Sequence, residues 1–310
     1  MDHPHTHRLL NVSTLANGAQ LALHLHELQG DLGDGPTVGI CAAIHGNEST
    51  GTQIVLELMR HFKQQLFRGR LFLLPVANPL AFEANRRHTP VDDQNLNRLF
   101  PGSPDGWVSE QLAHVMTEHF LNRVDALIDL HSGGDRPTVD YVYIKNDESL
   151  SRSFGSRVLY QARAGKVGTQ FDGTSVTAAQ ARGIPAVTVE LGGGLIDQTP
   201  YVERGVRGVL NMLRVLTVID EPPISPPGQM VVDSITTIRP HHGGFLETAA
   251  PGLGRRIEQG DVLGYIINPY TFEVLEEIYN PVADGVMILS HLTRNLVQPG
   301  DYGYMVGSPI

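Results

Sequence analysis

Residues 36–50, PTVGICAAIHGNEST, begin with a run of small and β-branched side chains and end in a polar segment that holds His45 and Glu48. A short apolar run of this kind predicts a buried strand. Two later stretches repeat the pattern: DALIDLH ends at His131, and IPAVTVELGGG carries Glu190 just before three glycines. Ligands of open α/β sheets bind beyond the carboxyl ends of the strands, so a site is predicted along that edge.

Segments with helical periodicity separate these strands. Apolar residues recur at helical spacing in three segments, residues 52–66, 108–124 and 201–219. Ser109 is expected to cap the second of them. Residues 20–28 alternate like a half-buried strand, which would place His24 and His26 on one face. Strands that alternate with helices predict an α/β fold with a mixed, mostly parallel sheet and helices on both faces.

The composition changes after residue 220. Residues 221–229, EPPISPPGQ, are rich in proline, which predicts a stiff linker. Beyond it, short apolar runs separated by Gly, Pro and Asp-Gly predict a small all-β sandwich domain over 230–310, after a first domain over 1–220 that carries the site. GRRIEQGDVLGYI (254–266) and TRNLVQPGDYGYM (293–305) form a weak internal repeat.

The overall composition narrows the class of protein. The chain of 310 residues has a net charge of −10 and no cluster of lysine and arginine, so no nucleic-acid partner is expected. A single cysteine excludes an intramolecular disulfide and favours a reducing compartment. No signal sequence and no stretch of about 20 apolar residues is visible, so a cytoplasmic protein without a membrane partner is expected. The sequence leaves open whether the chain forms a homo-oligomer. The histidines at 3, 5 and 7 could bind stray metal, but they are interpreted as part of a solvated, frayed terminus.

His45, Glu48 and His131 together supply two imidazoles and a carboxylate. Alone, a His-x-x-Glu pair is common in surface loops, but a third ligand from another strand end favours a metal site. Two histidines and one carboxylate leave a coordination position open, which is typical of catalytic zinc. A water in that position becomes a nucleophile at neutral pH. One Zn²⁺ per chain is therefore predicted, although the same ligands accept other divalent ions.

Two further carboxylates have alternative interpretations. Asp129 either orients the His131 imidazole or is a solvated side chain at a strand end. Glu190 lies at the end of an apolar strand, where an unpaired carboxylate is costly. Its position favours a role as the general base that accepts a proton from the attacking water, and a structural ion pair is the alternative.

Residues 85–102, NRRHTPVDDQNLNRLFPG, are too polar for a core and follow no helical or strand period. Their arginines and asparagines predict a substrate-binding loop. Arginine binds a carboxylate bidentately and can also stabilise the oxyanion that forms when water attacks a carbonyl.

Four motifs resemble the succinylglutamate desuccinylase/aspartoacylase family in order and spacing: HGNE (45–48), RHTPVDDQNLNRLFPG (87–102), DLHSGG (129–134) and VELGGG (189–194). The resemblance covers roughly residues 35–215 and implies a zinc enzyme on the scaffold of the metallocarboxypeptidases. The C-terminal part resembles the second domain of this family, which is similar to a biotinyl/lipoyl-type sandwich. No lysine stands at the turn of the repeat, so a carrier role is not supported.

The resemblance implies a role for each candidate residue. The implied zinc ligands are His45, Glu48 and His131. Glu190 would be the general base and then the general acid. Arg87 would polarise the scissile carbonyl, with the adjacent Arg86 as a competitor for this role. Asn97 and Arg98 would hold the α-carboxylate of the substrate.

Two departures from the family pattern bear on the substrate. Aspartoacylase proper reads a second carboxylate with an arginine upstream of the catalytic glutamate, and the nearest candidate here, Arg182, lies closer to Glu190, so a dicarboxylate substrate is not assured. The stretch ARGIPAVTVELGGG (181–194) is more similar to bacterial members that deacylate N-acyl diamino acids, such as N-acetyldiaminobutyrate deacetylases.

The predicted function is a zinc-dependent amidohydrolase, a deacylase that hydrolyses the amide bond of a small N-acyl amino acid by zinc-activated water. One alternative is a metallocarboxypeptidase that acts on short peptides with the same ligands. The other is a non-catalytic zinc-binding protein on the same scaffold.

Overall fold

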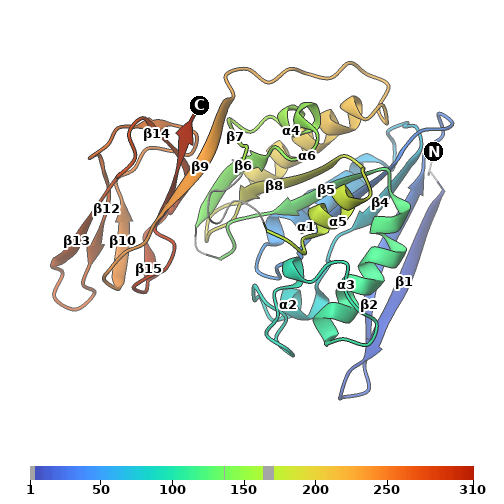
Figure 1. The fold of residues 1–310 in the computed structure, drawn as a ribbon, viewed down its shortest axis with the longest axis horizontal. Coiled ribbons are helices and arrows are strands. Elements are labelled where there is room, and N and C mark those ends of the chain that lie inside the picture. Colours follow the sequence, from blue (N-terminus) through green and yellow to red (C-terminus); the bar gives the residue numbers. More distant parts are fainter. Residues whose placement is uncertain (1–3, 136, 163–170) are drawn as a thin grey trace.

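The computed structural model describes residues 4–135, 137–162 and 171–310 (Figure 1). The strands before residue 220 are β1 (His5–Thr14), β2 (Gln20–Gln29), β3 (Thr37–Ala42), β4 (Arg70–Leu74), β5 (Ala126–His131), β6 (Thr138–Tyr143), β7 (Val158–Tyr160) and β8 (Ala186–Gly192). The α-helices are α1 (Ser49–His61), α2 (Pro79–Glu83), α3 (Val108–His119), α4 (Glu148–Ser153), α5 (Ser175–Ala181) and α6 (Thr199–Val215), and the 3₁₀ turns are η1 (Leu96–Arg98) and η2 (Leu121–Arg123). No helix within the described residues is long and apolar enough to cross a lipid bilayer.

The strands after residue 229 are β9 (Met230–Ile238), β10 (Gly244–Thr248), β11 (Arg256–Ile257), β12 (Val262–Ile267), β13 (Val274–Tyr279), β14 (Gly285–Ser290), β15 (Asn295–Val297) and β16 (Tyr304–Pro309). A sheet of 12 strands has the order β1-β2-β4-β3-β5-β8-β6-β7-β9-β16-β14-β11, and a second sheet has the order β13-β12-β10-β15. Strands β4, β3, β5 and β8 are parallel neighbours, and β1 and β2 are antiparallel to theirs. Strand β6 is antiparallel to β8 and parallel to β7. The predicted mixed α/β sheet is confirmed.

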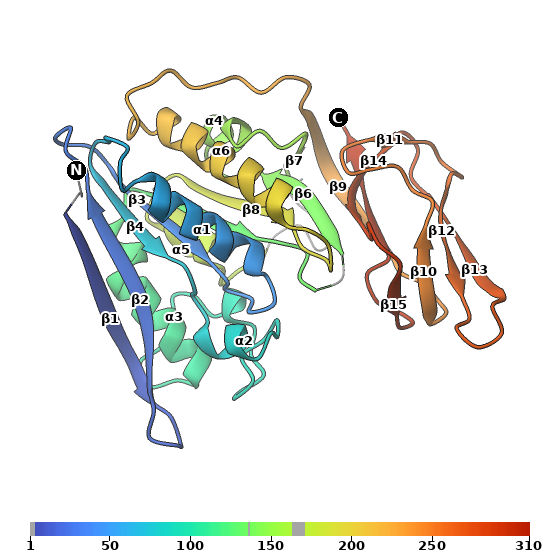
Figure 2. The same ribbon diagram turned by 180° about the vertical axis from the view of Figure 1, so that it is seen from behind.

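Alternate residues of the central strands pack into two separate core clusters. Val38 and Ile40 of β3 join the cluster formed with α1, α4 and α6, whereas Cys41 joins the cluster formed with α3 and α5. Helices α1 and α6 lie side by side across the strands in Figure 2. Gly205 allows their close packing, because a Cβ atom there would lie 2.3 Å from the Cδ1 atom of Ile54.

The helix predicted at 108–124 is shorter than expected, and its cap is a different residue. Helix α3 begins at Val108, so Ser109 lies inside the first turn. The backbone N–H of Ser109 donates to Oδ2 of Asp92 at 2.8 Å, and its hydroxyl contacts Oδ1 of Asp92 at 2.9 Å. The prediction of Ser109 as the cap is wrong, because a carboxylate from the preceding loop satisfies this helix end.

The prediction of a frayed N-terminus is wrong for His5 and His7, and His3 lies outside the described residues. Strand β1 begins at His5 and pairs antiparallel with β2 along its length. Leu10 and Val12 of β1 pack against the cluster formed with α3 and α5. This packing, with the backbone ladder, explains why the segment is ordered.

The C-terminal strands divide between the two sheets. β9 pairs with β7, and β14 pairs with β6, so part of this segment extends the large sheet, whereas β10, β12, β13 and β15 form the second sheet. Apolar residues from both sheets share one core cluster. A separate sandwich domain with its boundary at 221–229 remains a prediction.

The internal repeat has a structural counterpart in two turns. The backbone N–H of Glu258 donates to the Asp261 carboxylate at 2.8 Å, and the N–H of Gln298 donates to the Asp301 carboxylate at 2.9 Å. In both turns the aspartate N–H returns a bond to the carbonyl three residues earlier. The two Gly-Asp segments therefore fold in the same way.

Candidate active site

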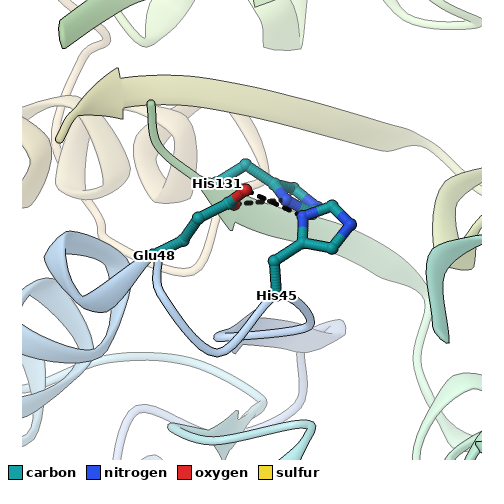
Figure 3. Close-up of side chains that lie close together, drawn as sticks. All are labelled: His45, Glu48 and His131. Carbon is teal, nitrogen blue, oxygen red and sulfur yellow. Dashed lines mark hydrogen bonds and ion pairs between the residues drawn. The ribbon is translucent and has the colours of Figure 1, made fainter. Parts of the chain in front are cut away.

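The three predicted metal ligands come together at the carboxyl ends of β3 and β5 (Figure 3). Nδ1 of His45 lies 2.8 Å from Oε1 of Glu48, and Nδ1 of His131 lies 2.8 Å from Oε2 of the same carboxylate. All three side chains are buried, and one ligand atom from each fits within 4.8 Å of the others. The carboxylate of Glu48 thus bridges the two imidazoles.

The backbone around these residues explains how they are held. Gly46 packs against the start of α2, where a Cβ atom would lie 1.9 Å from the backbone of Ala81, so a larger residue does not fit. The N–H of Glu48 donates to the carbonyl of His45 at 3.2 Å, which forms a tight turn between the ligands. The N–H of Ser132 donates to Oε2 of Glu48 at 3.1 Å.

The second nitrogen of each imidazole faces an oxygen acceptor. Nε2 of His131 lies 3.1 Å from Oδ2 of Asp129, and Nε2 of His45 lies 3.1 Å from Oδ1 of Asn95. A neutral imidazole carries a single N–H. With that proton on Nε2, the Nδ1 lone pairs and the Glu48 carboxylate converge, which fits a divalent cation with carboxylate-oriented histidines.

Asp129 has the position that the orienting interpretation requires. Its side chain is 1% exposed, so the alternative of a solvated strand-end carboxylate is wrong. The hydroxyl of Ser175, the first residue of α5, also donates to Oδ2 of Asp129, and the thiol of Cys41 donates to Oδ1 at 3.4 Å. Two donors besides His131 therefore fix the carboxylate.

The charges of the ligands depend on one another. Burial alone would raise the pKa of Glu48, but the imidazoles of His45 and His131 outweigh burial and hold it well below its usual value. Burial opposes charge on His131, but Asp129 and Glu48 outweigh burial and raise its pKa well above 6.5. Burial lowers the pKa of His45. One negative charge in the ligand cluster is therefore balanced by a proton, which a bound cation would replace.

Glu190 of β8 lies in register with His131 of β5 on one side and with Tyr141 of β6 on the other. No described residue donates a hydrogen bond to its carboxylate, so the structural ion pair considered as an alternative has no partner there. Burial is the main cause that raises the pKa of Glu190 to about 8, while the charge of His131 lowers it and that of Glu48 raises it. A carboxyl group with such a pKa can both accept and return a proton near neutral pH.

Arg87 reaches the ligand cluster, and Arg86 does not. Nη1 of Arg87 donates to Oε1 of Glu48 at 2.9 Å and lies 3.2 Å from Nδ1 of His45. Arg86 is exposed and is not among the described residues that line the cavity. The structure therefore places the guanidinium of Arg87 beside the ligand cluster.

Asn97 and Arg98 line the same cavity from η1. Nδ2 of Asn97 lies 3.4 Å from Nε2 of His131, and its Oδ1 accepts from the N–H of Ser175 at 3.1 Å. The guanidinium of Arg98 stacks on the ring of Phe171, 4.1 Å from its centroid, and donates to the Asn97 carbonyl at 2.6 Å. Both residues are among those that line the cavity.

The cavity has a volume of about 650 Å³ and is bounded by both halves of the chain. Tyr141, Tyr143 and Lys145 line the cavity, and so does Tyr302, which comes directly after the second repeat turn. Sequence reasoning missed these residues. The alternation of DYVYIK (140–145) would have placed the first three on one face, whereas nothing local points to Tyr302.

Arg182 has a structural contact instead of a substrate contact. Its guanidinium donates to the backbone carbonyls of Leu121, Asn122 and Val124 around η2. It is not among the described residues that line the cavity. The arginine considered for a second substrate carboxylate is therefore occupied elsewhere.

The comparisons with known proteins agree with this geometry. Residues 34–216 match the succinylglutamate desuccinylase/aspartoacylase catalytic domain. The chain is 30% identical over 270 residues to the N-alpha-acetyl-L-2,4-diaminobutyric acid deacetylase of Halomonas elongata, covering 82% of this chain and 77% of the relative. It also resembles a crystal structure of a succinylglutamate desuccinylase from Silicibacter sp. TM1040, with a TM-score of 0.82, 25% identity and coverage of 100% and 96% of the two chains.

A further structural neighbour is the product-bound ectoine utilization protein EutE (DoeB) from Ruegeria pomeroyi. It has a TM-score of 0.82 at 24% identity, with coverage of 99% of this chain and 95% of the other, and this likeness concerns the fold alone. The matched family domain spans more than half of the chain and includes His45, Glu48, His131 and Glu190. The resemblance inferred from the four motifs is confirmed: the chain belongs to the succinylglutamate desuccinylase/aspartoacylase family.

Proposed function

We propose that the chain is a zinc-dependent deacylase that hydrolyses the amide bond of a small N-acyl amino acid. The observation that carries the proposal is a single cavity that combines the His45–Glu48–His131 cluster with the carboxyl of Glu190 and the guanidinium of Arg87. A metal cluster alone would need neither of the last two residues. Family membership supports the same class of reaction.

His45, Glu48 and His131 would hold the metal. When bound, a divalent cation at these ligands would polarise the attacking water and the carbonyl oxygen of the amide. Glu190 takes a proton from the attacking water, because it is in register with His131 on the neighbouring strand and no described residue donates a hydrogen bond to its carboxyl. The same carboxyl then returns the proton to the leaving nitrogen.

Two arginines have the remaining roles in this proposal, stabilisation of the transition state and binding of the substrate carboxylate. Arg87 stabilises the negative charge that develops on the carbonyl oxygen, from its position next to Glu48. Arg98 and the amide of Asn97 bind the α-carboxylate of the amino acid, because both residues line the cavity and Nδ2 of Asn97 lies 3.4 Å from Nε2 of His131.

The proposed substrate is an N-acyl diamino acid, with N-acetyl-2,4-diaminobutyrate as the first candidate. Arg182 is engaged with backbone carbonyls, so the arginine expected to read a second substrate carboxylate is absent from the described cavity wall. The carboxylates of Asp135 and Asp301 line the cavity and would complement a substrate ammonium group. The name of the Halomonas elongata relative supports the same substrate.

The test combines metal analysis with a substrate panel. The purified protein should hold about one zinc per chain, as the three-ligand site implies, and should release amine from one preferred N-acyl amino acid among N-acetyl, N-succinyl and N-formyl compounds. Glu190→Gln should retain the metal and lose about 10²- to 10⁴-fold in kcat. Glu203→Gln on the exposed side of α6 is the matched control and should keep full activity.

Three results would contradict the proposal. Preference for peptides with a free amino group would favour a metallocarboxypeptidase. Bound metal without turnover of any compound would favour a non-catalytic zinc protein. Full activity of Glu190→Gln would show that another group moves the proton.

A further inference from the structure

Four histidines form a continuous stack on one face of the β1–β2 ribbon. The ring of His5 lies over that of His26, with centroids 5.2 Å apart, and His26 lies over His7 at 4.6 Å. His7 in turn stacks on His24 at 5.0 Å. We call these four residues the histidine ladder. His7 and His26 are direct cross-strand partners, and the other two are their diagonal neighbours.

The ladder is separate from the candidate active site. β1 is the edge strand of the large sheet, and β2, β4 and β3 lie between it and the His131 strand. In Figure 1, β1 and β2 (blue) lie at the opposite end of the molecule from the C-terminal strands that help to line the cavity. The reaction proposed above makes no use of these histidines.

Two nitrogen pairs within the ladder converge. Nε2 of His5 lies 3.0 Å from Nδ1 of His26, and Nε2 of His7 lies 2.9 Å from Nδ1 of His24. Two imidazoles bound to the same ion at right angles, with metal–nitrogen bonds of about 2.0–2.1 Å, have their nitrogens about 2.9 Å apart. A metal ion would therefore fit in place of the shared proton in each pair after small rotations of the two rings, and the strands would not have to move.

The surroundings favour neutral imidazoles, the form that binds metal. Burial and the neighbouring His7, His5 and His24 lower the pKa of His26 to about 4. The charged side chains of β1 and β2, Arg8 and Glu27, pair with each other at 3.2 Å. Strand alternation places that ion pair on the opposite face. The ladder therefore presents nitrogen donors with no carboxylate from its own strands.

We propose that the histidine ladder is a second metal site, which binds Cu²⁺ or a similar nitrogen-preferring divalent transition metal through the cross-strand pairs His5–His26 and His7–His24. Donors made only of imidazole suit such ions and not Mg²⁺ or Ca²⁺, which prefer oxygen. Because each pair joins the edge strand to β2, bound metal also stabilises β1 in the sheet.

The test measures Cu²⁺ uptake by the full-length, zinc-loaded protein. Equilibrium dialysis should show that the double variant His24→Asn/His26→Asn, which removes one partner from each pair, takes up less Cu²⁺ than the wild type, by up to one ion per pair. The active site is unchanged in this variant, so the difference isolates the ladder. The Cu²⁺ electron paramagnetic resonance spectrum of the wild type should show nitrogen hyperfine splitting that the variant lacks.

The complementary variant His5→Asn/His7→Asn removes the other partner of each pair and should show the same loss. His119→Asn, an exposed histidine on α3, is the matched control and should keep wild-type uptake. Deacylase activity equal to that of the wild type reports correct folding of both double variants. Wild-type Cu²⁺ uptake by both double variants would overturn the proposal, and so would a Mg²⁺ uptake that falls in parallel with that of Cu²⁺.

Discussion

Glu190 is a carboxyl group in a partly buried position where no described residue donates a hydrogen bond to it, and this has a measurable consequence for stability. Burial raises its pKa from 4.5 to about 8 in the metal-free protein. Below the lower value both the folded and the unfolded chains are protonated, so the group has no effect. Between the two values the unfolded chain loses its proton first, and folding becomes less favourable as the pH rises.

Glu190→Gln should therefore stabilise the metal-free protein at high pH and not at low pH. The expected gain in the free energy of unfolding grows from near zero at about pH 4 to roughly 1–3 kcal/mol at about pH 8, less than the full shift because water reaches the site. Urea unfolding in the presence of a chelator measures the gain, with Glu203→Gln as the control. A gain that is the same at both pH values would show that burial does not perturb this carboxyl.

Asp129 acts on the metal site through His131, so its replacement should weaken metal binding without removing a ligand. Asp129→Asn keeps the size of the side chain but replaces one acceptor oxygen with a donor, which disturbs the contact with Nε2 of His131 at 3.1 Å. Zinc affinity should fall about 10- to 100-fold. Competition with a chelator of known affinity measures this change. Asp125→Asn at the other end of β5 should keep wild-type affinity, and an equal loss in both variants would reject the orienting role.

At the scale of elements, Arg182 links the end of α5 to the turn that follows α3. Its guanidinium donates to backbone carbonyls at 121, 122 and 124, which the end of η2 would otherwise leave without donors. Arg182→Ala should lower the free energy of unfolding by about 1–2 kcal/mol, because partly buried acceptors lose a charged donor. The ratio of kcat/KM for N-acetylaspartate to that for N-acetyldiaminobutyrate should stay unchanged. A selective loss of the dicarboxylate substrate would restore Arg182 as a substrate contact.

At the scale of the whole molecule, the cavity depends on the C-terminal strands. Leu289, Tyr302 and Met305 lie on its wall, and the pairing of β14 with β6 connects this wall to the sheet that carries the ligands. We expect these strands to limit the size of the substrate that enters. Deletion of residues 228–310 would remove four strands from the large sheet, so it would disturb folding as well as substrate selection. A single substitution is the sharper experiment.

Tyr302→Ala should widen the cavity and relax the selection of small acyl groups. Tyr302 is 45% exposed, and Arg239 stacks on its ring at 4.4 Å, so its loss should cost little stability. The ratio of kcat/KM for an N-benzoyl to an N-acetyl substrate should rise about 10-fold or more, of the order expected for a few methylene-sized contacts. Tyr270→Ala, at the exposed tip between β12 and β13, should leave the ratio unchanged. An unchanged ratio in Tyr302→Ala would argue against selection by the C-terminal strands.

The sequence by itself determined the strands that carry the site and the identity of the candidate ligands. Apolar runs that end at His45, His131 and Glu190 are local patterns, and parallel strands bring their carboxyl ends to one edge whatever the rest of the chain does. The mixed sheet, the family and the shared turn of the two repeats follow from patterns of the same local kind.

Only the tertiary structure decided which neighbours these residues meet. The choice of Arg87 over Arg86, the burial of Asp129 and the engagement of Arg182 with backbone carbonyls depend on segments far apart in the chain. The ordering of His5 depends on the pairing of β1 with β2, and the place of Tyr302 in the cavity wall depends on the pairing of the distant strands β14 and β6. Such contacts have no local pattern, because they form when separate elements pack together and exclude water.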